Sequence, residues 1–371
     1  MRFFNVDRHV SVIEDVAVQL RALGHSVESH LLSGLHWALG RPRAARGSGA
    51  THAGKVGYGC LNLDTVESFL GDYPDYAAAS AWRRVHPELA SFDGFIVTYP
   101  PSFALLYEGL PGRVVLDAPV RYDFGFTGRP EVWRDFNERL QRMQGEGRLV
   151  PVANSRYDAA YFTHFTGIPC HRVSSTCDYV DRLSPKWSPR GRKLLAFGDR
   201  DGCRAAAAHC DDVLYVRDVL PRYEHAEVAM ARGVVWIPYN CSIMSFFEHY
   251  WLGIPLYVPT ERFLVELEGR GLALSELTWH ASRRAGSVIE AAVGSAMPDP
   301  HTEDGLRAWM PLYDFYDDWE FPHVVRFDSW QDLREKIEGG RAEEQSAAIL
   351  AHNVGRRARN LEAWRGLVDW R

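Results

Sequence analysis

The stretch VVWIPYNCSIMSFFEHYWLGIPLYVPT, residues 234–260, is the most informative part of the sequence. It predicts a buried strand, a Pro-Tyr-Asn turn, a helix that begins at Ser242 and, after Gly-Ile-Pro, a second short strand. Asn240 or Ser242 can cap this helix. Its first turn then presents free backbone N–H groups at the carboxyl end of the strand, which favours the binding of a diphosphate there.

One face of this helix is polar. Ser242, Ser245 and Glu248 are spaced three residues apart, so their side chains share that face. At about 1.5 Å of rise per residue, Glu248 lies roughly 9 Å along the axis from Ser242. A carboxylate at that distance from a diphosphate bound near Ser242 suits the paired hydroxyls of a nucleotide ribose. In the alternative interpretation, Ser242 only caps the helix and Glu248 is a structural ion-pair partner.

Short apolar runs alternate with helical segments on both sides of this stretch. Such alternation with short connections is typical of parallel sheets, so we predict an α/β fold of two doubly wound, Rossmann-like domains facing a cleft. The expected parts are an N-terminal Rossmann-like domain at 1–180, a Pro-containing linker at 181–192, a C-terminal Rossmann-like domain at 193–340, and a helix at 341–371 that packs back across the domains.

Two arginines follow predicted strands of the C-terminal half. Arg200 lies in the loop FGDRDG and Arg217 comes after DVLYV. A fixed positive charge at either position would stabilise a departing diphosphate. The nearby pair Asp199 and Asp201 fits a loop and a helix cap better than a metal site, so the sequence predicts neither a metal nor a cofactor.

The loop after the first strand of the N-terminal half carries a candidate catalytic base. His9 titrates near working pH, and Asp7 or Asp15 can orient its ring. The alternative is that Asp7 caps the next helix and His9 is merely exposed. Asp123, in PVRYDF at another strand end, is a second candidate base or a loop salt-bridge partner, and His36 is a third candidate.

Composition narrows the class of protein. The chain has 371 residues, enough for two domains, and its net charge of −6 argues weakly against a protein that coats duplex DNA. Six scattered cysteines without a CxxC pair indicate reduced thiols. No apolar stretch is long enough for a membrane span and no signal peptide is visible, so we expect a cytoplasmic protein without an integral membrane segment.

The run from Val234 to Pro259 resembles the donor-site segment of GT-B glycosyltransferases. NVDRHVSV, SGLHW and FPHVVRFDSWQDL are similar to stretches of uncharacterised glycosyltransferase-like bacterial and viral proteins. The resemblance implies that Glu248 binds the ribose and that Ser242, Ile243, Met244 and Ser245 cradle the diphosphate without a metal. It also supports His9, because many inverting enzymes of this fold carry their base at that position.

The sequence departs from the retaining pattern of that family, which has two glutamates eight residues apart. Asn240 stands eight residues before Glu248, so the choice between inversion and retention stays open.

The sequence therefore predicts a hexosyl- or pentosyltransferase that moves a sugar from a nucleotide-sugar donor to an acceptor hydroxyl. The acceptor stays open: a glycan, a small molecule or a modified nucleic acid. A sugar-nucleotide epimerase of similar shape and a non-enzymatic nucleotide-binding protein are the alternatives. Turnover of a nucleotide sugar without acceptor would distinguish the epimerase, and binding without sugar release would indicate the binding protein.

Overall fold

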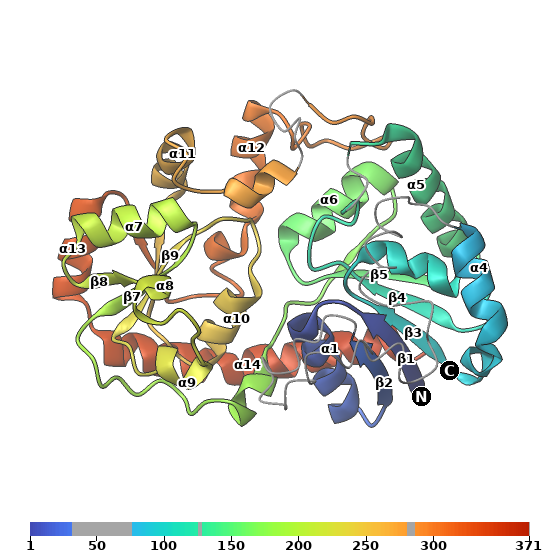
Figure 1. The fold of residues 1–371 in the computed structure, drawn as a ribbon, viewed down its shortest axis with the longest axis horizontal. Coiled ribbons are helices and arrows are strands. Elements are labelled where there is room, and N and C mark those ends of the chain that lie inside the picture. Colours follow the sequence, from blue (N-terminus) through green and yellow to red (C-terminus); the bar gives the residue numbers. More distant parts are fainter. Residues whose placement is uncertain (32–75, 125–127, 280–285, 371) are drawn as a thin grey trace. The chain divides into compact units, whose positions relative to one another are not determined.

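The computed structural model describes residues 1–31, 76–124, 128–279 and 286–370 (Figure 1). The chain divides into two compact units. Unit 1 comprises Met1–Ser175, Gly286–Asp299 and Asn360–Arg371, and unit 2 comprises Thr176–Ala285 and Pro300–Arg359. The candidate His36 lies outside the described residues. Residues 181–192, predicted to be a linker, belong to unit 2.

Among the described residues, unit 1 is built on a sheet of six parallel strands in the order β2-β1-β3-β4-β5-β6. The strands have apolar, buried cores such as the valines and leucine of β4, as expected of a sheet covered on both faces. Their bounds are β1 (Arg2–Asp7), β2 (Ser26–Leu31), β3 (Gly94–Val97), β4 (Arg113–Asp117), β5 (Leu149–Ala153) and β6 (His171–Arg172).

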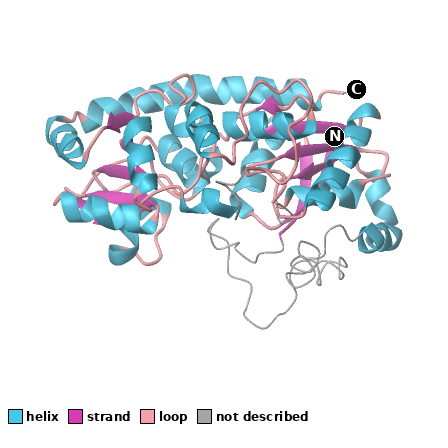
Figure 2. Ribbon diagram, turned by 90° about the horizontal axis from the view of Figure 1, so that it is seen from above, coloured by secondary structure: helices cyan, strands magenta, loops and turns pink. Residues whose placement is uncertain are grey.

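Helices complete unit 1, and in Figure 2 the strands lie between helices. The main ones are α1 (Val10–Ala22), α4 (Tyr76–Val85), α5 (Pro130–Gly145) and α6 (Arg156–Thr166). Chain order reverses between β1 and β3, because β2 lies on one side of β1 and the later strands lie on the other. In doubly wound sheets ligands bind outside the carboxyl ends of the strands at this switch point.

Unit 2 repeats this plan with five parallel strands in the order β11-β10-β9-β7-β8. Its switch point lies between β7 and β9, because β8 lies on one side of β7 and the later strands lie on the other. The bounds are β7 (Leu194–Gly198), β8 (Val213–Tyr215), β9 (Gly233–Ile237), β10 (Leu256–Pro259) and β11 (Val325–Phe327). The predicted α/β class with two doubly wound parallel sheets is therefore confirmed.

The helices of unit 2 correct one prediction. They are α7 (Arg200–His209), α8 (Val216–Val219), α9 (His225–Val228), α10 (Met244–Trp251), α11 (Glu261–Gly269), α12 (Glu303–Trp309) and α13 (Trp330–Gly339). The sequence of residues 221–232 predicts a helix over that whole range, but α9 begins only at His225. The carboxylate of Glu227 accepts from the backbone N–H of Glu224 at 2.8 Å and so marks the start of this short helix.

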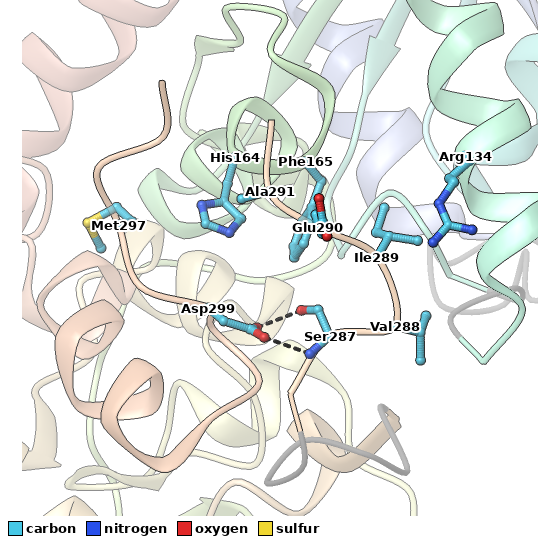
Figure 3. Close-up of a pocket in the computed structure, with 10 residues that line it drawn as sticks. All are labelled: Arg134, His164, Phe165, Ser287, Val288, Ile289, Glu290, Ala291, Met297 and Asp299. Carbon is cyan, nitrogen blue, oxygen red and sulfur yellow. Dashed lines mark hydrogen bonds between the residues drawn. The ribbon is translucent and has the colours of Figure 1, made fainter. Parts of the chain in front are cut away.

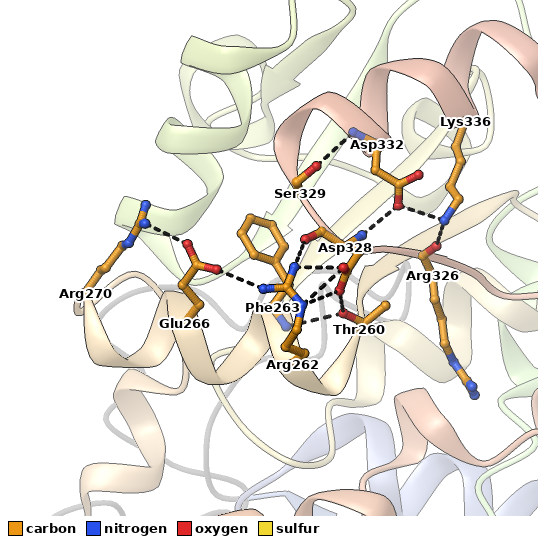
Figure 4. A network of polar contacts seen from close by, with 10 residues as sticks. All are labelled: Thr260, Arg262, Phe263, Glu266, Arg270, Arg326, Asp328, Ser329, Asp332 and Lys336. Atoms are coloured by element: carbon orange, nitrogen blue, oxygen red, sulfur yellow. Dashed lines mark hydrogen bonds and ion pairs between the residues drawn. The ribbon is translucent and has the colours of Figure 1, made fainter.

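A polar network holds the ends of β10 and β11 together (Figure 4). The carboxylate of Asp328 accepts from the hydroxyl of Thr260 at 2.5 Å and from Nε of Arg262 at 3.0 Å. Asp332 accepts from the backbone N–H of Asp328 at 2.7 Å and from Nζ of Lys336 at 2.8 Å. The hydrogen-bond partners of these groups lie within the network, which indicates a structural role.

The long helix α14 (Ala342–Val368) contributes to both units, with residues 342–359 in unit 2 and the rest in unit 1. In unit 2 the fully buried Arg356 donates from Nε to Glu320 at 2.7 Å. In unit 1 the ring of Trp370 meets that of Phe3 edge-on at 5.8 Å, and the guanidinium of Arg113 lies over it at 5.2 Å. Within the described ranges, no helix has the length and apolarity to cross a membrane.

Candidate functional site

The first loop of unit 2 passes very close to its neighbouring strand at the switch point. Gly198 has φ +116°, and a Cβ at that position would lie 1.9 Å from the carbonyl oxygen of Ile237. The next residue, Asp199, donates its backbone N–H to the same carbonyl at 2.7 Å. Only glycine fits both this conformation and this approach. The loop is therefore fixed against β9, at the carboxyl ends of both strands.

Asp199 is the N-cap of α7, as the sequence predicted. Its carboxylate accepts from the backbone N–H of Asp201 at 3.1 Å and of Gly202 at 3.2 Å. Arg200 is the first residue of this helix and is exposed. Its guanidinium is thus available to a ligand at the carboxyl edge. In the described part of the chain, no group of three or more His, Cys, Asp or Glu residues is arranged to hold a metal ion.

The helix α10 starts later than the sequence predicted. It begins at Met244, and its N-cap is Ile243, which makes no side-chain capping bond. The side chain of Asn240 instead accepts from the adjacent backbone N–H of Cys241 at 2.8 Å. The prediction that Asn240 or Ser242 caps the helix is wrong, because residues 238–243 form a longer turn whose apolar members, among them Ile243, are buried in the core.

Glu248 lies on the second turn of α10 and is 6% exposed. Its Oε1 accepts a short hydrogen bond from the hydroxyl of Tyr179, which belongs to the single turn η4 (Asp178–Arg182). Its Oε2 lies 4.0 Å from Nδ1 of His225, the first residue of α9. The carboxylate is therefore held on one side and faces an imidazole on the other.

Tyr223 links several of the predicted donor residues. The guanidinium of Arg217 lies over its ring at 4.9 Å, within the range of a cation–π contact. Burial raises the pKa of Tyr223 most and the charge of Glu248 raises it further, whereas Arg217 and a hydrogen bond with Ser245 lower it. Arg217, Ser245 and Glu248 thus gather around one tyrosine at the carboxyl ends of β8 and β9.

Sequence reasoning did not identify Tyr223, Tyr179 or His225. The motif RYEH, which follows β8 and its short helix α8, carries two of them and was assigned to a helix. An aromatic residue and a histidine just after a strand's carboxyl end were the available signal. Tyr179 gave none, because its contact with Glu248 spans 69 residues of sequence.

Asp7 occupies the switch point of unit 1 and is fully buried. Its Oδ2 accepts from the backbone N–H groups of Thr98 and Tyr99, both at 3.1 Å, and from the hydroxyl of Thr98 at 2.5 Å. Its Oδ1 accepts from the backbone N–H of His9 at 2.8 Å. Burial raises the pKa of Asp7 to about 6, although these hydrogen bonds oppose the rise.

The contact between Asp7 and His9 differs from the prediction. We expected Asp7 or Asp15 to orient the imidazole ring, and the hydrogen bond of Asp7 goes to the backbone N–H of His9 at the start of α1. The ring of His9 meets that of Tyr99 edge-on at 6.0 Å. His9 is half-buried at the carboxyl end of β1, the place at which a catalytic base of this unit was predicted.

Asp117, at the carboxyl end of β4, is a titratable group that sequence reasoning missed. It is 2% exposed, and among the described residues its Oδ1 has no hydrogen-bond partner. Burial, followed by the negative charges of Asp15, Asp7 and Asp158, raises the pKa of Asp117 to about 8. Asp158 differs, because its carboxylate accepts from the hydroxyl of Ser155 at 2.7 Å.

Asp123 lies in the turn after β4 and is fully buried. Burial raises the pKa of Tyr122 and of Tyr161 well above the usual value, and the charge of Asp123 contributes to both shifts. The hydroxyl of Tyr122 donates to Asn137 at 2.7 Å. The structure therefore places Asp123 among the aromatic side chains that pack α5 and α6.

A cavity of about 400 Å³ lies elsewhere in unit 1, between α5, α6 and residues 286–299 (Figure 3). Asp299 accepts from both the backbone N–H and the hydroxyl of Ser287 at 2.6 Å, and His164 shares a hydrogen bond of 2.6 Å with Ser295. The residues that line this cavity include none of those predicted from the sequence. Asp299 and His164 thus already have hydrogen-bond partners in or beside the wall of this cavity.

Comparison with known proteins gives structural likenesses only. No protein-family model and no curated protein matches the sequence. The fold is similar to that of CalG4, the calicheamicin glycosyltransferase, at 13% identity and a TM-score of 0.40, covering 99% of this chain and 98% of that one. It is also similar to the glycotransferase of kitacinnamycin, at 11% identity and a TM-score of 0.41, covering 99% of each chain.

A third likeness is to the glycosyltransferase SnogD from Streptomyces nogalater. The identity is 14% and the TM-score 0.43, covering 99% of this chain and 100% of that one. At these identities and TM-scores, the likenesses say nothing about what this chain binds or transfers.

Proposed function

We propose that the chain is a glycosyltransferase that takes a sugar from a nucleotide donor held by unit 2 and transfers it to an acceptor hydroxyl. The observation that carries this proposal is the polar group at the carboxyl ends of β8 and β9. Glu248, Ser245 and Arg217 gather there around Tyr223, beside the switch point of a doubly wound sheet. A carboxylate for hydroxyls and a guanidinium for phosphates are the groups that a nucleotide diphosphate needs.

The reaction is a displacement at the anomeric carbon of the donor sugar. A base removes the proton of the acceptor hydroxyl as its oxygen bonds to that carbon, and the bond to the diphosphate breaks. Arg217 or Arg200 would stabilise the negative charge that develops on the departing diphosphate, because both are exposed at the carboxyl edge of unit 2. His9 is the proposed base, and Asp117 is the alternative.

Ligand-induced stabilisation tests the proposal directly. The protein should melt at a higher temperature in the presence of at least one member of a panel of nucleoside diphosphates and nucleotide sugars. A ligand at about 100 times its dissociation constant adds roughly 2.7 kcal/mol to the free energy of unfolding. Nucleosides without phosphate serve as the control. No stabilisation by any member of the panel would contradict the proposed function.

Replacing Glu248 with alanine should weaken the binding of the nucleoside diphosphate by roughly 1 to 3 kcal/mol, the scale of hydrogen bonds to a charged group. Titration calorimetry with the ligand found in the panel measures the loss. Ser245→Ala on the same helix is the matched control and should lose about one neutral hydrogen bond, on the order of 1 kcal/mol or less. Unchanged affinity in Glu248→Ala would exclude this carboxylate as a ligand.

A further inference from the structure

The two oxygens of Glu248 have different surroundings. Oε1 is bound by the hydroxyl of Tyr179, which is 1% exposed and lies on η4. A buried neutral donor of this kind fixes the rotamer of the carboxylate without cancelling its charge. Tyr179 therefore holds Oε2 in a constant direction, toward α9.

Oε2 and His225 face each other without bonding. Nδ1 of His225 lies 4.0 Å from Oε2, beyond the roughly 2.7–3.2 Å of a hydrogen bond. In the part of the chain that the structure describes, this Nδ1 is buried and has no hydrogen-bond partner. The two side chains keep 15% and 8% of their surfaces exposed. A buried polar atom without a partner costs about 1–3 kcal/mol, so a hydroxyl that bonds both groups would be favourable.

A second histidine, His249, lies near this pair but does not complete it. His249, behind it on α10, is fully buried against the rings of Phe197 and Trp236. Burial lowers the pKa of His249 well below its usual value, and the charge of His225 adds to the effect. His249 is therefore neutral and does not supply the missing charge partner of Glu248.

We propose that His225 and Glu248 together bind the two hydroxyls of the donor's ribose, with Tyr179 as a positioning residue. This inference rests on the proposed function. A carboxylate only accepts hydrogen bonds, whereas an imidazole can also donate one, so the pair matches two adjacent hydroxyls, each able to donate and to accept. A site built for hydroxyls rejects an analogue that lacks one. The donor is accordingly a ribonucleotide sugar, such as one of uridine or guanosine, rather than a deoxythymidine sugar.

The test compares matched nucleotides. Calorimetry measures the affinity of UDP against 2′-deoxy-UDP and of GDP against 2′-deoxy-GDP. The wild type should bind the ribonucleotide about tenfold more tightly or better, and His225→Phe should reduce that ratio to roughly twofold or less. His209→Phe is the control, because His209 is exposed on α7 and should leave the ratio unchanged. Tyr179→Phe should raise the donor KM severalfold and leave kcat unchanged.

The outcomes separate this inference from the function on which it rests. If the wild type binds none of the four nucleotides and no other member of the panel, the proposed function fails with it, whereas binding of dTDP alone would overturn only this inference. If the wild type binds and its preference for the ribonucleotide survives in His225→Phe, the assignment of His225 is wrong while nucleotide binding stands. Equal affinity of the wild type for both members of a pair would also overturn the inference. A kcat loss in Tyr179→Phe without a change in donor KM would overturn its positioning role.

Discussion

With His9 replaced by alanine, turnover should fall by about 10²- to 10⁴-fold, the usual contribution of a general base. His9 follows β1 at the switch point of unit 1, and its backbone N–H is fixed there by Asp7 at 2.8 Å. Donor affinity should stay nearly the same, because the proposed donor ligands all belong to unit 2. Steady-state kinetics with saturating donor and calorimetry of the nucleoside diphosphate measure the two quantities separately.

Two further variants decide between the candidate bases. Asp123→Asn should change turnover little, because Asp123 is fully buried beside Tyr122 and Tyr161. If His9→Ala turns over at the wild-type rate, His9 is not the base, and a large loss in Asp117→Asn would then assign that role to Asp117. If His9→Ala loses donor binding instead, the ring contacts the donor and the base lies elsewhere.

Replacing Asp117 with asparagine should stabilise the protein by several kcal/mol above pH 8. The pKa of Asp117 is about 8 in the folded state against 3.8 for an ordinary aspartate. Stability from this group is therefore fully present below pH 3.8 and is lost as the pH rises through 8. The gap is about 4 units, which at 1.36 kcal/mol per unit is on the order of 5 kcal/mol.

Denaturant unfolding of the wild type and of Asp117→Asn at pH values from 5 to 9 measures this effect. The difference in unfolding free energy should grow with pH and level off above 8, because asparagine carries no charge to bury. Asp218→Asn is the control, since Asp218 is 55% exposed and pairs with Arg204 at the surface. A difference that does not depend on pH would show that Asp117 is not protonated in the folded state.

The strands were predictable from the sequence because buried parallel strands appear as short, continuous apolar runs. The run 149–153 predicts β5 with the bounds that the structure has, and the run 234–237 predicts β9 to within one residue. β6 and β11 have only two and three residues, too few for such a pattern. The two doubly wound sheets could therefore be predicted, but the edge strands β6 and β11 could not.

The candidate site was predictable only where its residues share one local element. Ser245 and Glu248 could be placed on one face because they lie three residues apart on α10. The start of that helix was misjudged because the buried turn of residues 238–243 is stabilised by packing rather than by a capping side chain. The contact of Tyr179 with Glu248 and the raised pKa of Asp117 both depend on side chains that are distant in sequence. No local pattern reports such contacts.

Unit 1 is built from three separate segments of the chain, Met1–Ser175, Gly286–Asp299 and Asn360–Arg371. The ribosome therefore makes the first segment long before the last. Multidomain chains often fold their first domain while the rest is still being made. Here one ring partner of Phe3, on the first strand, is Trp370, which is translated more than 360 residues later. A nascent chain therefore carries an incomplete first unit, with part of its apolar surface uncovered, until Trp370 has been made. Its folding yield should depend on chaperones that bind this surface during that interval.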